Sequence, residues 1–131
     1  MKTKLNLLAI GIFLAAAVAG SGQSTVQFTA TSYTTAESAG TVAVAVQRLN
    51  DTNTAVTVDY VAVDGTATNG LNYTAISGTL AFSDGETNKT ILLTILNNGF
   101  VEGTKNFQVI LSNPTNAILG PRTNATVSIT N

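Results

Sequence analysis

The strictest constraint on the fold is the stretch Thr41 to Arg48, TVAVAVQR, in which valine and alanine alternate. Val42, Val44 and Val46 share one phase of the pattern and the alanines share the other. Successive side chains of a β-strand point to opposite faces, whereas an α-helix repeats every ~3.6 residues. The stretch therefore predicts a β-strand with one buried face.

The same period of two residues recurs in further short runs, and Gly, Asn, Asp and Pro separate one run from the next. These runs are residues 26–33, 55–63, 78–83, 87–96, 106–111 and 122–131. No stretch outside the N-terminus keeps a helical period. Seven short strands over about a hundred residues are the pattern of an antiparallel, immunoglobulin-like β-sandwich. A closed barrel is the alternative.

The phase of each run predicts which side chains form the core. The inward positions are Val26, Phe28, Ala30, Val42, Val44, Val46, Val56, Val58, Tyr60, Ala62, Leu80, Phe82, Ile91, Leu93, Ile95, Phe107, Val109, Leu111, Ala125, Val127 and Ile129. Residues 49–53 form a polar turn cluster, which predicts that 41–48 and 55–63 pair as a hairpin. Residues 112–121 contain two prolines and predict a loop.

The N-terminus has the organisation of an export signal. Met1 to Lys4 is a short basic start, Leu5 to Val18 is apolar, and small residues follow at 17–19. The apolar run is short for a membrane span, which needs roughly 20 residues. We therefore expect a cleaved signal peptide at residues 1–22 and a domain at 24–131, with an uncleaved anchor as the alternative. The expected location is secreted or at the cell surface or envelope, without membrane insertion after cleavage.

The residue types present exclude several classes of function. The chain has no His and no Cys, which excludes Ser-His and Cys-His nucleophilic catalysis. A zinc site is nearly excluded for the same reason, because zinc ligands are mainly His and Cys. The seven acidic residues outnumber the four basic ones that remain without Lys2 and Lys4. Such a weakly acidic surface argues against nucleic acid as a partner. No carboxylate pair stands out as catalytic, so we expect no catalytic residues and no enzyme.

Several motifs in combination resemble the Calx-beta domain family. They are Glu37 with Gly40, the strand ending in Arg48, VDYVAVDGTATNGLNY at 58–73, GTLAFSDGET at 78–87 and VEGTKNFQVILSNP at 101–114. The resemblance covers nearly all of 26–131 and implies a sandwich module that usually occurs within longer proteins. It also implies a calcium site at one end of the sandwich. The family's ligand positions fall on Glu37, Asn72, Asn97, Asn98 and Glu102, and a further acidic position falls on Lys105.

Charge decides what these family positions can do. Calcium takes about 6–8 hard oxygen ligands, and its affinity depends on the number of ligand charges. Only Glu37 and Glu102 are acidic, and Lys105 adds a positive charge. The leading hypothesis is therefore an exported, non-catalytic module with a structural, adhesive or protein-interaction role, an unknown protein or surface partner, and no cofactor. The alternatives are a module that binds Ca2+, at most weakly, and an accessory domain of a larger secreted enzyme.

Overall fold

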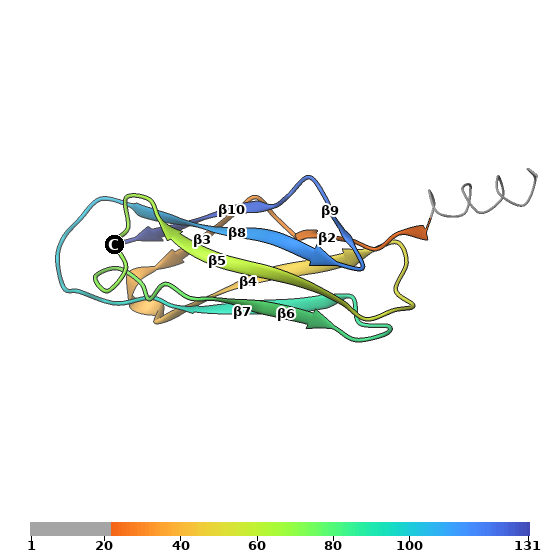
Figure 1. Cartoon of the computed structure of the whole chain (residues 1–131). Coiled ribbons are helices and arrows are strands. Elements are labelled where there is room, and N and C mark those ends of the chain that lie inside the picture. Colours follow the sequence, from red (N-terminus) through yellow and green to blue (C-terminus); the bar gives the residue numbers. More distant parts are fainter. Residues whose placement is uncertain (1–21) are drawn as a thin grey trace, which may run out of the picture.

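The computed structural model describes residues 22–131, so the predicted signal peptide lies outside the described residues except for its last position. The described part consists of nine strands and one short 3-10 helix, η1 (Figure 1). In chain order they are β2 (Thr25–Phe28), β3 (Ser32–Ala36), η1 (Glu37–Ala39), β4 (Thr41–Leu49), β5 (Val56–Asp64), β6 (Ser77–Phe82), β7 (Asn88–Thr94), β8 (Lys105–Thr115), β9 (Ile118–Leu119) and β10 (Asn124–Thr130).

The strands form two sheets that pack face to face. One sheet has the order β3-β10-β8-β5-β6, and the other has the order β7-β4-β2-β9. The predicted all-β sandwich is therefore confirmed, and the barrel alternative is wrong because the two sheets are separate. Within residues 22–131, no helix is long and apolar enough to cross a membrane.

The first predicted strand is divided between the two sheets. β2 pairs antiparallel with β4, whereas β3 pairs parallel with β10 in the opposite sheet. The chain crosses over at residues 29–31, and Ala30, which we predicted to face inward, is only half-buried there. This division and the two-residue β9 account for the difference between seven predicted strands and nine observed ones.

The predicted hairpin of 41–48 with 55–63 is wrong, because β4 and β5 belong to different sheets. β4 pairs with β7 and β2, while β5 pairs with β6 and β8. Buried Arg48 holds the connection that crosses between them: its guanidinium donates to the carbonyl oxygens of Asp51 at 3.1 Å, Ser83 at 3.3 Å and Thr54. Two strands with inward valines can face each other across a sandwich as well as pair side by side.

The loop that we predicted at 112–121 begins later in the structure, because β8 continues through Pro114 to Thr115. The pairing of β8 with β5 changes register between Asp59↔Ser112 and Thr57↔Thr115. Proline has no N–H for a regular ladder and is tolerated where the ladder is interrupted. The register shift therefore explains how a proline fits within this strand.

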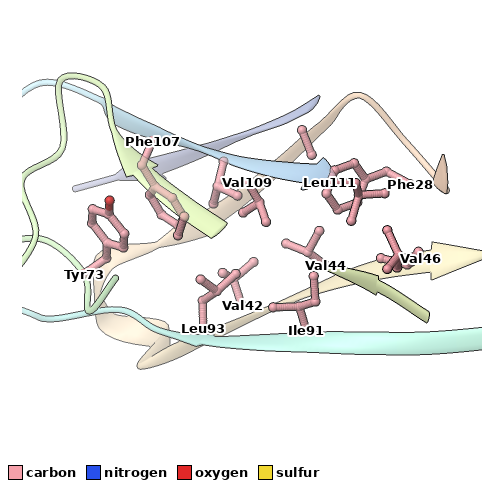
Figure 2. Close-up of a cluster of buried hydrophobic side chains, with 14 of the residues drawn as sticks. Phe28, Val42, Val44, Val46, Tyr73, Ile91, Leu93, Phe107, Val109 and Leu111 are labelled. Carbon is pink, nitrogen blue, oxygen red and sulfur yellow. The ribbon is translucent and has the colours of Figure 1, made fainter. Parts of the chain in front are cut away.

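The inner faces of the sheets supply the core, as the alternation predicts (Figure 2). Most predicted inward residues are buried, although Tyr60 and Leu80 are only half-buried. At one end of the core, the ring of Tyr73 stacks on Phe107 with centroids 3.9 Å apart and planes 3° apart. The Tyr73 hydroxyl donates to Asp64 at 2.6 Å. This stack lies directly beneath the loops of the candidate site.

Candidate functional site

Three loops and the end of the chain meet at one end of the sandwich (Figure 1). The loop 95–104 connects β7 with β8 and therefore crosses from one sheet to the other, as predicted. The amide of Leu96 in this loop donates to the carbonyl of Asn72 at 2.9 Å, which joins it to the β5–β6 loop. The amide of Glu102 donates to Oδ1 of Asn131 at 2.8 Å, which joins it to the chain end.

The carboxylate of Glu102 lies at the centre of this region. Its Oε2 accepts hydrogen bonds from the side-chain amides of Asn98 at 2.8 Å and Asn72 at 3.1 Å. Its Oε1 lies 3.6 Å from the ammonium of Lys105. We call these four residues the Glu102 cluster. The Glu102 side chain is 16% exposed, so two hydrogen-bond donors and one ammonium of the chain itself surround a largely desolvated negative charge.

Backbone donors fix the orientation of both asparagine side chains. Oδ1 of Asn72 accepts the amide N–H of Thr68 at 2.8 Å, and Oδ1 of Asn98 accepts that of Phe100 at 2.9 Å. An amide group has its oxygen and nitrogen on opposite sides, so each Nδ2 faces Glu102. Both asparagines therefore present hydrogen-bond donors, not oxygen ligands, to the carboxylate.

The two remaining predicted positions have different surroundings. Glu37 is 8% exposed, and its Oε2 accepts the backbone N–H of Asn98 at 3.0 Å. Asn97 is exposed, and its Oδ1 accepts the N–H of Gly99 at 3.2 Å within the same loop. Hydrogen bonds thus connect Glu37, Asn72, Asn98 and Glu102, whereas Asn97 makes a local turn contact.

A calcium ion does not fit this arrangement as it stands. Calcium needs several oxygen ligands, but two amide groups donate to Oε2 of Glu102 and the positive charge of Lys105 lies 3.6 Å from Oε1. Across residues 22–131, no three His, Cys, Asp or Glu side chains are grouped so that they could hold a metal ion. The sequence indicated Lys105 as a charge that opposes a cation. The sequence did not reveal that Lys105 forms an ion pair with Glu102, although the two residues are only three positions apart.

Comparison with known proteins agrees with the motifs. The Calx-beta domain family model matches residues 21–131. Sodium/calcium exchanger 1 of Canis lupus familiaris is 40% identical over 82 residues, which are 62% of this chain and 8% of that protein. Extracellular matrix organizing protein FRAS1 of Mus musculus is 34% identical over 111 residues, which are 81% of this chain and 3% of that protein. The chain thus spans less than a tenth of the length of these relatives.

Solved structures show the same fold. The apo form of the Calx CBD1 domain matches with a TM-score of 0.80 and 28% identity, covering 82% of this chain and 96% of that one. The calcium binding domain CBD12 of CALX1.1 matches with a TM-score of 0.78 and 29% identity, covering 81% of this chain and 45% of that one. With the family model spanning the whole described sandwich, the chain belongs to the Calx-beta domain family.

Proposed function

We propose that this chain is an exported, non-catalytic Calx-beta module whose loop end keeps its shape without calcium, and that it has a structural, adhesive or protein-interaction role at the cell surface. The observation that supports cation independence is the Glu102 cluster, in which the carboxylate accepts hydrogen bonds from Asn72 and Asn98 and forms an ion pair with Lys105. The module then works as a rigid unit whose loops need no ion to become ordered.

The energetics of the cluster support this reading. A buried carboxylate without a partner is strongly unfavourable, and hydrogen bonds to a charged group contribute about 1.5–3 kcal/mol each. Glu102 has two such bonds and an ammonium within ion-pair distance. Binding a cation at Glu102 would first have to displace these donors. The cost of displacement offsets much of the attraction between a divalent ion and the two carboxylates.

The second candidate is calcium binding, which the names of two similar proteins favour. One is a sodium/calcium exchanger and another is described as a calcium binding domain. For this chain, Glu37 and Glu102 would be the charged ligands, and the amides of Asn72 and Asn98 would have to rotate before their oxygens could take part. The amide N–H groups of Thr68 and Phe100 would then lose their acceptors.

Thermal unfolding in millimolar calcium and in a chelator separates the two candidates. A ligand at about 100 times its Kd stabilises the folded state by roughly 2.7 kcal/mol, which is a shift of several degrees. We expect coinciding curves for the natural chain. A higher Tm in calcium, absent in magnesium, would contradict cation independence.

A charge-restored variant provides the positive control for that experiment. Asn72→Asp, Asn98→Asp and Lys105→Glu together would replace two amides and one ammonium with three carboxylates. We expect this variant to melt lower than the natural chain in chelator and to regain stability in calcium. If calcium raises the Tm of both proteins equally, the donors of the Glu102 cluster do not determine ion dependence.

The surface location rests on the predicted signal and on the likeness to a protein named for extracellular matrix organization. Export is tested by expressing the chain with and without residues 1–22 and sequencing the N-terminus of the exported form. An adhesive role is tested by coating beads with the purified chain and measuring their attachment to matrix-coated surfaces. Retention of the full chain inside the cell would contradict export.

A further inference from the structure

β7 is an edge strand: β4 pairs with it on one side, and no strand of residues 22–131 pairs with it on the other (Figure 1). Its seven residues pair with β4 in an unbroken antiparallel register, without a bulge or a proline. We propose that the open side of β7 is a contact between two copies of this chain, which pair there strand to strand around a two-fold axis. The proposal rests neither on export nor on calcium independence.

Hydrogen bonds at the two ends of β7 show which of its residues face β4. The amide of Ile95 donates to the carbonyl of Gly40 at 2.9 Å. The amide of Arg48 donates to the carbonyl of Thr87 at 2.8 Å. In an antiparallel pair, residues that exchange hydrogen bonds with the partner strand alternate with residues whose N–H and C=O point the other way. The odd-numbered residues of β7 therefore face β4, and the even-numbered residues present their backbone groups at the open edge.

The stretch with open backbone groups is short and bounded. At its C-terminal end, the carbonyl of Thr94 accepts the N–H of Thr74 at 3.0 Å, so a loop of the same chain covers that position. Asn88, Thr90 and Leu92 remain, and no backbone group within residues 22–131 bonds to theirs. Each of these three residues has one N–H and one C=O, so six backbone groups point outward from the strand.

The pattern of open groups is complementary to itself. Residues 88 and 92 are equally spaced about Thr90. A two-fold axis at Thr90 therefore places Thr90 opposite its counterpart and Asn88 opposite Leu92 of the other copy. Each opposing pair exchanges two hydrogen bonds, so all six groups of each copy gain a partner. Only another extended backbone offers donors and acceptors at this spacing, and an isologous contact of this kind closes as a dimer.

The side chains of β7 permit this pairing. Natural edge strands are commonly protected by charged side chains, proline or a bulge. The one charged residue of β7 is Lys89, and Glu86 of the same chain neutralises it at 3.1 Å. Leu92 on the outward face is 61% exposed, and Ala43 lies directly across from it on β4. In the dimer, Asn88 of the other copy covers part of this apolar side chain.

The other edges of the sheets are less suited to the contact. β9, at the far edge of the same sheet, has only two residues. β6, at an edge of the opposite sheet, has no large apolar side chain that is exposed. β6 therefore serves as the internal comparison for β7. A contact made by one strand is at the weak end of protein interfaces, so we expect a dissociation constant on the order of 1 mM.

Single cysteines test the register, because the chain has no cysteine of its own. Thr90→Cys places two sulfurs across the two-fold axis, on residues whose Cα atoms lie about 5.5 Å apart, within the range that a disulfide bridges. Asn88→Cys is the matched control, since it is exposed on the same strand but its two copies lie about 13 Å apart along the pair. We expect Thr90→Cys to form a disulfide-linked dimer at least about tenfold faster under mild oxidation. Equal rates would overturn the proposal.

The natural chain provides a test without any substitution. Hydrogen exchange at the amides of Asn88, Thr90 and Leu92, followed by NMR, should slow about twofold as the protein concentration approaches about 1 mM, because half of the chains are then paired. The amides of β6 should keep their rates. Slowing at β6 in place of β7, or no change at either strand, would refute pairing through β7.

Charges at Thr90 test whether the partner is a second copy. Thr90→Lys or Thr90→Glu alone places like charges directly opposite each other, which disfavours the pair. We expect neither variant to show the concentration dependence and an equal mixture of the two to regain it, with the folding of each checked by thermal unfolding. An unchanged concentration dependence in either variant alone, or a mixture that regains none, would contradict the pairing of Thr90 with its own counterpart.

Discussion

Glu102→Gln is the sharpest perturbation of the loop end, because it keeps the shape of the side chain and removes its charge. The carboxylate accepts hydrogen bonds from Asn72 and Asn98 and forms an ion pair with Lys105. Glutamine offers one oxygen and places an NH2 group among donors. Asn72 is 3% exposed, so water cannot easily replace its lost acceptor. Hydrogen bonds to charged groups are worth about 1.5–3 kcal/mol each. We expect a loss of about 2 kcal/mol in the free energy of unfolding.

For a domain of this size, such a loss lowers Tm by about 10 °C. The assay is thermal unfolding followed by circular dichroism, with chelator present throughout. Glu86→Gln is the matched control, because Glu86 also forms an ion pair with a lysine three residues later, Lys89 at 3.1 Å. That pair is more exposed than the pair of Glu102 with Lys105, and surface pairs contribute little. Glu86 also accepts the N–H of Ser83 at 2.7 Å, and the oxygen of glutamine can still accept it. If Glu102→Gln melts no lower than Glu86→Gln, the cluster does not stabilise the loop end.

Three further changes test the rest of the sandwich. Arg48→Met leaves buried carbonyls without donors and should lower the free energy of unfolding by about 3 kcal/mol, measured by urea unfolding. An unchanged urea midpoint would contradict the role of Arg48 in holding the connection between β4 and β5. Phe107→Ala removes the fully buried ring that stacks on Tyr73 and should cost about 3–5 kcal/mol by the same measurement; a loss typical of a surface residue would contradict it. Burial, followed by the hydrogen bond to Asp64, raises the pKa of Tyr73. The contribution of the neutral Tyr73 side chain to the free energy of unfolding is therefore complete below pH ~10 and is lost as the pH rises further. The difference in stability between the natural chain and Tyr73→Phe should shrink above that pH.

The alternation in the sequence was enough to predict the fold class and most of the core. It could not predict sheet membership, because inward valines of β4 and β5 look the same whether the strands pair or face each other. It also could not place Pro114, since the register shift that accommodates it depends on the partner strand. Patterns of burial are local properties of a strand, whereas pairing depends on residues far away in the chain.

The candidate site shows the same limit at the level of single atoms. The family resemblance identified Glu37, Asn72, Asn98 and Glu102, which hydrogen bonds do connect in the structure. Which atom of each asparagine faces Glu102 depends on the backbone N–H groups of Thr68 and Phe100. Those groups exist at every non-proline position, so no residue type signals their role. Their positions follow only from the folded loops.

The placement of β2 and β10 has a mechanical consequence. Each lies inside its sheet, β2 between β4 and β9 and β10 between β8 and β3, and the chain enters and leaves the sandwich at opposite ends (Figure 1). Ladder hydrogen bonds run across the strands, so tension along the long axis loads all the bonds of a ladder together in shear. Peeling would load them one at a time. A pull along the long axis on β2 and β10 would therefore have to break many ladder hydrogen bonds at once.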